Sequence, residues 1–159
     1  MAQFYRIVQE QWAARALDGE GARLYGGRWN SPGSAAVYLA ESRALAALEI
    51  LVHAQREALR LSWIVIEMEI DDSLIDRVPL SKLPGNWRLQ PTSHQAQTFG
   101  SRWLRDVRNL ALRLPSVIIP EEFSLLLNPL HPKMREMRPG KSKSFSFDSR
   151  LVARVQPEM

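Results

Sequence analysis

The stretch Tyr25–His53, YGGRWNSPGSAAVYLAESRALAALEILVH, organises the predictions for the rest of the chain. It begins with two glycines directly before Arg28, and glycine permits positive φ and a close approach of a partner to the backbone. The sequence NSPG at residues 30–33 is typical of a tight turn. The apolar run at residues 36–40 has the length of a strand, and Ser42 is a suitable N-cap for the helix that follows.

A glutamate lies within the apolar stripe of this helix, which the sequence predicts from Arg43 to about Leu59. Apolar residues recur there at helical spacing, at Leu45, Leu48, Val52 and Leu59. Glu49 falls on the same side of the helix. A buried carboxylate is costly unless it is paired or hydrogen-bonded. Spacing alone leaves two interpretations. Glu49 either lies at the edge of the stripe, where it reaches solvent or pairs with a structural arginine, or it is a functional carboxylate in a cleft.

Length and composition indicate one ordinary globular domain across residues 1–159. The chain is 45% hydrophobic and 24% charged, and these values argue against wholesale disorder. It has no cysteine, which excludes disulfides, thiol catalysis and thiolate metal sites and fits a reducing compartment. The N-terminal residues lack a signal-peptide pattern, and no apolar run has the length of a membrane span. We therefore expect a cytoplasmic protein with no membrane contact.

The remaining pattern favours an α+β fold of short, mostly antiparallel strands with two longer helices. Residues 63–70 alternate between apolar and polar side chains, as a half-buried strand does. Further strands are predicted at residues 4–8, 116–120 and 123–128, with final edge strands at 144–148 and 151–155. A second helix is predicted at residues 95–112, a short helix or loop at 9–17, and a surface connection at 79–93.

Five residues are candidates for a functional site, and each also has a structural interpretation. Arg28, after two glycines, either holds a phosphate or diphosphate together with backbone N–H groups, or is a structural arginine. Tyr38 offers a stacking surface for a flat heterocycle or is a core tyrosine. Ser116 and Asn128 flank apolar runs, where capping of turns and strand ends is the common role. Glu49 is the fifth candidate.

Several familiar sites are absent from the sequence. It contains no Walker motif, GxGxxG or GxSxG. His53, His94 and His131 lack the spacing of metal ligands, so no metal is expected. The net charge of +4 is compatible with an anionic ligand and is weak evidence for nucleic acid. The basic stretch Lys133–Lys143 is interpreted as a solvated loop, or alternatively as a patch that faces phosphate.

Four segments together resemble the RES domain, the toxin half of RES–Xre toxin–antitoxin pairs. They are YGGRWNSPG, VYLAESRALAALEILVH, LPSVIIPEEFSLLLNPLHP and FSFDSRL, and the resemblance extends from Tyr5 to Leu151. The family is named after an arginine, a glutamate and a serine, which by motif are Arg28, Glu49 and Ser116, with Tyr38 also in a matching position. One departure is the segment EEFSLLLNP, where Phe123 stands near the place of a more usual asparagine.

The resemblance implies an ADP-ribosyltransferase-like fold and an enzyme that consumes NAD+ and thereby arrests growth. It also implies an Xre-type helix-turn-helix antitoxin that covers the entrance of the active site, and a homodimer within that complex. Under this reading Glu49 stabilises an oxocarbenium-like ribose, and Arg28 binds the diphosphate. Tyr38 stacks on nicotinamide or ribose, Ser116 orients Glu49 or a ribose hydroxyl, and Asn128 adds a supporting hydrogen bond.

Other classes of function stay open at this stage. The acceptor of the ADP-ribosyl group is water, phosphate or a protein side chain, and the last makes the chain a mono-ADP-ribosyltransferase. A non-catalytic nucleotide-binding module is a further alternative. Nucleic-acid binding through Lys133–Lys143 ranks last, because the sequence has no basic recognition helix and no RNA-binding aromatic motif.

Overall fold

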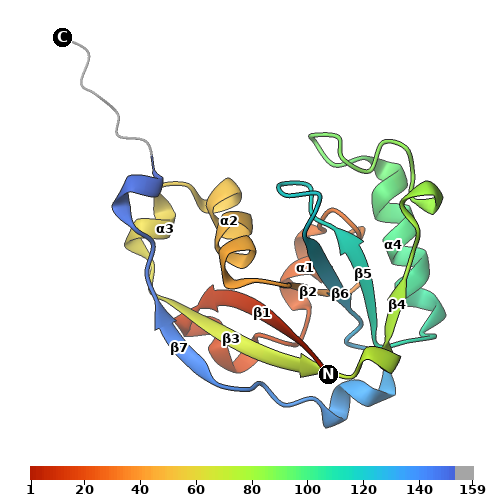
Figure 1. Cartoon of the computed structure of the whole chain (residues 1–159), viewed down its shortest axis with the longest axis horizontal. Helices are drawn as coiled ribbons and strands as arrows, with labels where there is room; N and C mark the ends of the chain where they lie inside the picture. Colours follow the sequence, from red (N-terminus) through yellow and green to blue (C-terminus); the bar gives the residue numbers. More distant parts are fainter. Residues whose placement is uncertain (153–159) are drawn as a thin grey trace.

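A seven-stranded sheet with the strand order β4-β5-β6-β2-β1-β3-β7 runs through the computed structural model, which describes residues 1–152 (Figure 1). All neighbouring strands pair antiparallel except β4 and β5, which are parallel. The strands are β1 Ala2–Gln9, β2 Val37–Ala40, β3 Trp63–Ile70, β4 Ile75–Arg77, β5 Ala111–Pro115, β6 Phe123–Leu127 and β7 Ser142–Phe145. The prediction of an α+β fold with mostly antiparallel strands is confirmed.

Two helices are longer than the others, as predicted: α2 Arg43–Ala54, with 12 residues, and α4 His94–Asp106, with 13. Ser42 and Ser93 cap them, since their side chains accept hydrogen bonds from the N–H groups of Leu45 and Ala96. The shorter elements are α1 Glu20–Tyr25, α3 Glu57–Arg60 and the 3-10 turns η1 Glu10–Arg15, η2 Asp72–Leu74, η3 Leu80–Lys82, η4 Pro132–Glu136 and η5 Ser149–Leu151. None of the helices in residues 1–152 is long and apolar enough to cross a membrane.

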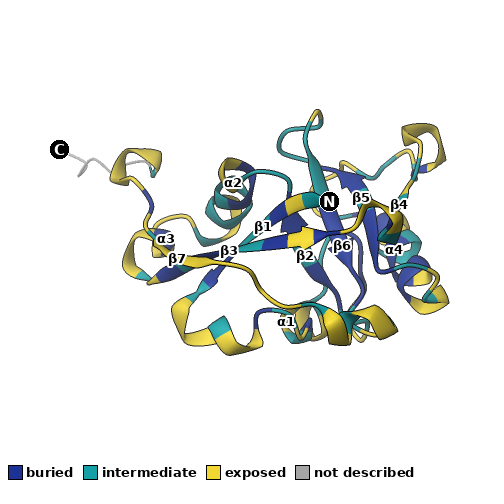
Figure 2. Ribbon diagram, turned by 60° about the horizontal axis from the view of Figure 1, so that its bottom comes forward, coloured by how far each residue is buried: buried dark blue, intermediate teal, exposed yellow. Residues whose placement is uncertain are grey.

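Helices α2 and α4 lie on the same face of the sheet (Figure 1). The register pairs Tyr5 with Ala40 and Tyr38 with Leu126, so these side chains share one face. On that face α2 packs in a cluster with Ala40 and Trp63, and α4 packs against strands β5 and β6. The opposite face carries a second buried layer, which contains Phe4, Val8, Leu39, Met68, Leu125 and Leu127. Buried residues of both layers are dark blue in Figure 2.

The predicted helix at residues 95–112 is too long, and the predicted strand at 116–120 is wrong. Helix α4 ends at Asp106, Val107 takes a positive φ of 49°, and the chain then forms β5 at Ala111–Pro115. The side chain of Asn109 accepts a hydrogen bond from the Leu110 N–H, an alternative to helical bonding that ends the helix. Residues 116–122 form the connection between β5 and β6.

The helix predicted from Arg43 to about Leu59 is interrupted. It ends at Ala54, Gln55 takes a positive φ of 47°, and α3 follows at Glu57–Arg60. Consequently Leu45 is buried as predicted, whereas Val52 and Leu59 are 52% and 42% exposed. Helix α1 was not predicted. The edge strand β7 begins and ends earlier than the predicted 144–148, and most of the predicted strand at 151–155 lies outside the described residues.

Candidate active site

The loop that carries Arg28 is folded around Asn30, which is fully buried. The side-chain amide of Asn30 donates to the carbonyls of Ala22 at 2.8 Å and Ser34 at 2.9 Å, and its Oδ1 accepts from the Tyr38 hydroxyl at 2.6 Å. The loop also closes through a backbone bond from Gly27 N–H to the Asn30 carbonyl. The sequence predicts Asn30 only as a turn residue, although it follows the GGRW signature directly.

The two glycines before Arg28 serve different needs. Gly26 has a positive φ of 76°, as predicted from the sequence. At Gly27 an added Cβ would lie 2.8 Å from both the Tyr38 hydroxyl and Asn30 Oδ1. Gly27 therefore allows the close approach of the backbone to the hydrogen-bonded pair that organises the loop.

Helix α4 fixes this loop from one side. The Gln97 side chain donates to the Gly27 carbonyl at 3.0 Å, and the Ser101 hydroxyl accepts from the Ser31 N–H at 2.9 Å. Gly100 lies so close that an added Cβ would be 1.8 Å from the Trp29 carbonyl oxygen. The position of Arg28 is thus set by α4.

One nitrogen of the Arg28 guanidinium is hydrogen-bonded within the protein. Nη1 donates to the carbonyls of Trp87 and Leu89, each at 2.9 Å, which ties the segment between η3 and α4 to the loop. Burial lowers the pKa of Arg28, and the negative charge of Glu49 acts in the opposite direction. Within residues 1–152 no partner is bonded to Nε or Nη2. Those donors are available to an anionic ligand.

The Tyr38 hydroxyl is fully used inside the protein. It accepts from the Trp29 N–H at 3.1 Å and donates to Asn30. Burial raises the pKa of Tyr38 above its ordinary value, against the opposing effects of the Trp29 N–H and Arg28. The phenol is therefore neutral and structural, and only its ring is left to contact a substrate.

Glu49 and Ser116 are brought together from helix α2 and the end of β5. The Ser116 hydroxyl donates to Glu49 Oε1 at 3.2 Å. The same hydroxyl oxygen accepts from the N–H groups of Ile118 and Ile119 at 3.1 and 3.2 Å. Burial raises the pKa of Glu49, while the Ser116 hydrogen bond, His53 and Arg28 oppose that rise. Glu49 is thus half-buried, and three neighbours favour its ionised form.

The β5–β6 connection also holds the beginning of α2. The Ser42 hydroxyl donates to Glu122 Oε1 at 2.8 Å while it caps the helix. Backbone and side-chain atoms of Glu41 bond to Phe123 in both directions. Glu122 was not predicted as a site residue, because its acidic side chain lies in a turn and has no recognisable spacing to Ser42.

Asn128 does not join the other four residues. It is fully buried, its amide donates to the Leu104 carbonyl at 2.8 Å, and its Oδ1 accepts from the Leu130 N–H at 3.1 Å. It follows the last residue of β6, whereas Ser116 lies beside the first residues of that strand. The expected contact of Asn128 with a substrate finds no support in this arrangement.

Phe123, the departure from the family pattern, lies on the other face of the sheet. It alternates along β6 with Leu126, which shares the face of Tyr38, so its ring points to the face of Leu125 and Leu127. There the Arg113 guanidinium lies 3.6 Å from the ring centroid. The absence of an asparagine at Phe123 therefore removes no group from the Glu49 side.

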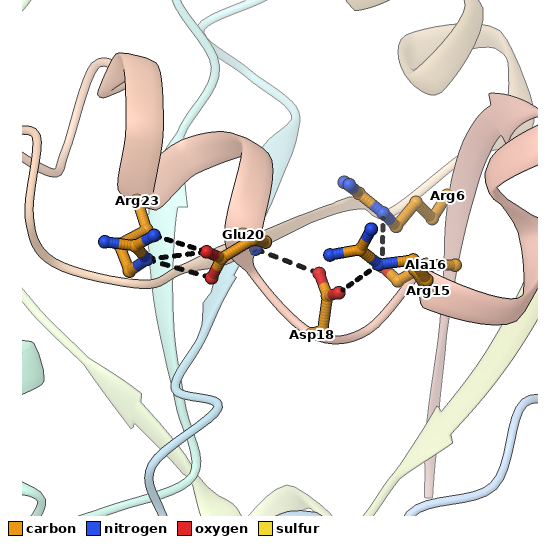
Figure 3. Close-up of polar contacts among 6 residues, drawn as sticks. All are labelled: Arg6, Arg15, Ala16, Asp18, Glu20 and Arg23. Atoms are coloured by element: carbon orange, nitrogen blue, oxygen red, sulfur yellow. Dashed lines mark hydrogen bonds and ion pairs between the residues drawn. The ribbon is translucent and has the colours of Figure 1, made fainter.

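The half-buried Arg6 bonds to the backbone of two other segments, and Figure 3 shows its bond to Ala16. Arg6 donates from Nε to the Ala16 carbonyl and from Nη1 to the Tyr38 carbonyl, each at 2.9 Å. Burial lowers the pKa of Arg6 to about 10, against the attraction of Asp18. Ion pairs of Arg15 with Asp18 and of Arg23 with Glu20 continue along the surface toward α1. Arg6 thereby joins β1, β2 and the segment before α1.

The fold and these contacts define an α+β protein that presents an arginine, a tyrosine ring, a glutamate and a serine on one side of its sheet. Residues 3–148 match the RES domain model. The chain belongs to the RES domain family. Within residues 1–152 no three His, Asp or Glu side chains are grouped as a metal site would require.

Curated relatives match almost the whole chain. A protein of Sphingobium sp. (strain YBL2) named "Prs ADP-ribosylating toxin" is 37% identical over 157 residues, which cover 96% of this chain and 98% of the relative. A "Toxin Res" of Yersinia enterocolitica is 40% identical over 148 residues, covering 92% and 97%. Among solved structures, the M. tuberculosis MbcT–MbcA toxin–antitoxin complex contains a chain with a TM-score of 0.72 and 19% identity. That match covers 91% of this chain and 84% of the other, and it shows a shared fold.

Proposed function

We propose that this chain is the toxin of a toxin–antitoxin pair and cleaves the bond between nicotinamide and ribose in NAD+, depleting NAD+ in the cytoplasm and arresting growth. One observation carries the proposal: a half-buried carboxylate, Glu49, accepts a hydrogen bond from the Ser116 hydroxyl, and the positive charge of Arg28 acts to lower its pKa. The names of the Sphingobium and Yersinia relatives support a toxin role, and the first of them supports the use of an ADP-ribosyl donor.

The proposed role of Glu49 is to stabilise positive charge on the ribose. As nicotinamide leaves with the bonding electron pair, the ribose becomes oxocarbenium-like. A fixed carboxylate in a sheltered site interacts more strongly with that state than with neutral substrate, and this difference accelerates the reaction. Ser116, His53 and Arg28 counter the effect of burial on the pKa of Glu49, so we expect the carboxylate to be ionised at neutral pH.

Arg28 and Tyr38 would bind the rest of the substrate. Nη1 of Arg28 is held by two carbonyls, which leaves Nε and Nη2 to donate to the diphosphate. The ring of Tyr38, fixed at its hydroxyl by Asn30, would stack on nicotinamide or ribose. Arg28 belongs to the loop at residues 26–34, and the Tyr38 hydroxyl is hydrogen-bonded to that loop. The substrate would therefore meet a preformed surface.

The acceptor determines the product. An oxygen of water attacking the ribose and losing a proton gives ADP-ribose, and phosphate gives ADP-ribose 1″-phosphate. We favour these small acceptors. The name of the Sphingobium relative supports the alternative in which a protein side chain accepts the ADP-ribosyl group.

The proposed partner is an Xre-type helix-turn-helix antitoxin that covers the entrance of the active site, with two copies of the toxin in the complex. The structural match to a chain of a toxin–antitoxin complex is consistent with a protein partner of this kind. The proposal requires no metal and no direct contact with nucleic acid or membrane.

The test is mass spectrometry of the purified, antitoxin-free chain incubated with NAD+, with and without phosphate. Glu49→Gln keeps the shape and the acceptor for Ser116 but removes the charge. Glu57→Gln, at an exposed α3 residue that forms an ion pair with Arg60, is the matched control. We expect free nicotinamide from the parent and from Glu57→Gln but not from Glu49→Gln. If the folded parent released no nicotinamide under any condition, a nucleotide-binding module without catalysis would replace this proposal.

A further inference from the structure

The sheet carries a further polar residue on the face of α2 and α4, and none of the roles proposed so far uses it. Ser124 is the second residue of β6, an interior strand between β2 and β5. It pairs with Ala40 on β2 and with Leu114 on β5, so the three side chains share one face. Tyr38 lies two residues before Ala40 and therefore on the same face. Ser124 thus points to the side of the sheet on which the substrate is proposed to bind.

Ser124 lies at the boundary between the parts of this face that the two long helices cover. Its neighbour Ala40 packs in the cluster of α2, and its other neighbour Leu114 packs in the cluster of α4. Leu126, the next residue of β6 on this face, is fully buried in the cluster of α4, whereas Ser124 is only half-buried. A ligand can therefore reach Ser124 between the two clusters.

The hydroxyl of Ser124 is free to bind a ligand. Within residues 1–152 it has no hydrogen-bond partner, whereas the nearby hydroxyls of Ser116 and Ser42 donate to Glu49 and Glu122. A serine hydroxyl has one donor and two acceptor positions. All of these positions at Ser124 are open to a polar group that lies over the middle of the sheet.

Ser124 also lies midway between the two parts of the proposed active site. Two residues away in one direction, the Ser116 N–H bonds to the Glu122 carbonyl, and Ser116 in turn holds Glu49. Two residues away in the other direction is the row of Tyr38. Two residues of a strand span about 7 Å, so Ser124 is about that far from each row. A substrate that extends from Tyr38 to Glu49 must pass over Ser124.

We propose that the Ser124 hydroxyl binds the carboxamide of nicotinamide and makes the site selective for nicotinamide as the leaving group. This inference rests on the proposed cleavage of NAD+. With the ribose at Glu49 and the base toward Tyr38, the nicotinamide lies over Ser124. Arg28 is assigned to the diphosphate and Glu49 to the ribose, which leaves the carboxamide as the polar group of this half of the substrate without a partner. A neutral hydroxyl suits it, because it can donate to the carboxamide oxygen, and the apolar side chains beside Ser124 contact the ring.

The test compares two substrates that differ only in the carboxamide: NAD+, and the analogue in which pyridine replaces nicotinamide. The kcat/KM for release of the base would be measured with each substrate for the parent, Ser124→Ala and Ser124→Thr. We expect Ser124→Ala to lower kcat/KM for NAD+ by roughly three- to tenfold, the range of one neutral hydrogen bond, and to leave the value for the analogue unchanged. Ser124→Thr keeps the hydroxyl and should retain the parental preference for NAD+. The unequal reactivity of the two leaving groups cancels, because each substrate is compared with itself in two proteins.

A serine on the opposite face of the sheet provides the matched control. Ser144 is an exposed residue of β7 and pairs with Ile64, which packs in the buried layer of the other face. Ser144→Ala should cleave both substrates like the parent. Equal losses with both substrates in Ser124→Ala would show a merely structural effect and overturn the proposal, and so would an unchanged preference for NAD+.

A binding experiment separates this inference from the proposed reaction. In Glu49→Gln, calorimetry would give the Kd of NAD+ and of the pyridine analogue with and without Ser124→Ala. We expect Ser124→Ala to weaken the binding of NAD+ alone, again by roughly three- to tenfold. That result, together with a parent that releases no nicotinamide, would overturn the proposed cleavage and support the contact with the carboxamide. If the folded chain bound neither compound, both proposals would be overturned.

Discussion

The hydroxyl of Ser116 donates to the carboxylate of Glu49, and the backbone fixes the direction of that hydrogen bond. The hydroxyl oxygen accepts from two N–H groups, those of Ile118 and Ile119, so its own proton is directed at Glu49 Oε1. A donated proton favours the charged form of a carboxylate. A neutral serine, oriented by the β5–β6 connection, thereby counters the effect of burial on the pKa of Glu49.

Replacing Ser116 by alanine should slow NAD+ cleavage and change its pH dependence. The lost bond to a charged group corresponds to roughly a ten- to hundredfold lower kcat/KM. Because the Ser116 bond lowers the pKa of Glu49, its removal should move the acidic limb of the kcat/KM profile to higher pH. Ser116→Thr keeps a hydroxyl and should retain the parental limb. An unchanged limb in Ser116→Ala would contradict the proposed coupling.

Glu49→Gln should stabilise the protein at neutral pH. Burial raises the pKa of Glu49 in the folded state, so above the ordinary value of 4.5 the folded chain binds more protons than the unfolded chain. Parental stability is therefore present at low pH and is lost as pH rises through the shifted pKa. The glutamine variant has no such loss, so its Tm should exceed the parental Tm at pH 7 and match it near pH 4. A parental Tm that exceeds the Tm of the variant at pH 7 would contradict a raised pKa of Glu49 in the folded state.

Local sequence predicted the elements that have strong local signals and missed those that tertiary contacts determine. The Ser42 cap and the alternation in β3 were sufficient to place α2 and that strand. The end of α4 was misplaced because Val107 and Leu110 continue the helical spacing of Phe99 and Trp103, while pairing with β6 makes residues 111–115 a strand.

The candidate site shows the same division. Arg28, Glu49 and Ser116 stand out by motif, but the reason for their geometry lies in contacts between distant segments. Asn30 is recognisable as a turn residue, yet its bonds to Tyr38 and to Ala22 are formed only in the folded chain. No local pattern indicated that Asn128 would bond to a carbonyl of α4.

Replacing Asn128 by alanine should reduce stability without a specific effect on catalysis. The change leaves the Leu104 carbonyl and the Leu130 N–H without their partner. Each unpaired group should lower the free energy of unfolding by about 1–3 kcal/mol. Denaturant unfolding should report the loss, while kcat and KM of the folded fraction should equal the parental values. A KM for NAD+ raised tenfold in the folded variant would restore Asn128 to the substrate site.

Tyr38→Phe should separate the structural hydroxyl from the ring. The variant leaves the Trp29 N–H and Asn30 Oδ1 unpaired, so we expect a loss of about 1–3 kcal/mol in unfolding free energy. Because burial raises the pKa of Tyr38 above its ordinary value of 10.0, the phenol stays neutral through the working range of pH. The basic limb of the kcat/KM profile should therefore be the same in both proteins. Tyr5→Phe, which loses only an exposed bond to Gln3, is the control, and a basic limb that disappears in Tyr38→Phe alone would show that the phenol ionises.

Gly100→Ala should disable the site from a helix that carries none of its predicted residues. The new Cβ would meet the Trp29 carbonyl oxygen at 1.8 Å, so the loop at residues 26–34 must move away from α4. Arg28 lies directly before Trp29 and would move with it, which predicts weaker NAD+ binding together with a stability loss of about 1–3 kcal/mol. Gly21→Ala in α1 is the matched control, because an added Cβ there meets nothing within 4 Å and alanine favours a helix. If Gly100→Ala retained the parental KM for NAD+ and the parental Tm, α4 would not position Arg28 as its contacts with the loop imply.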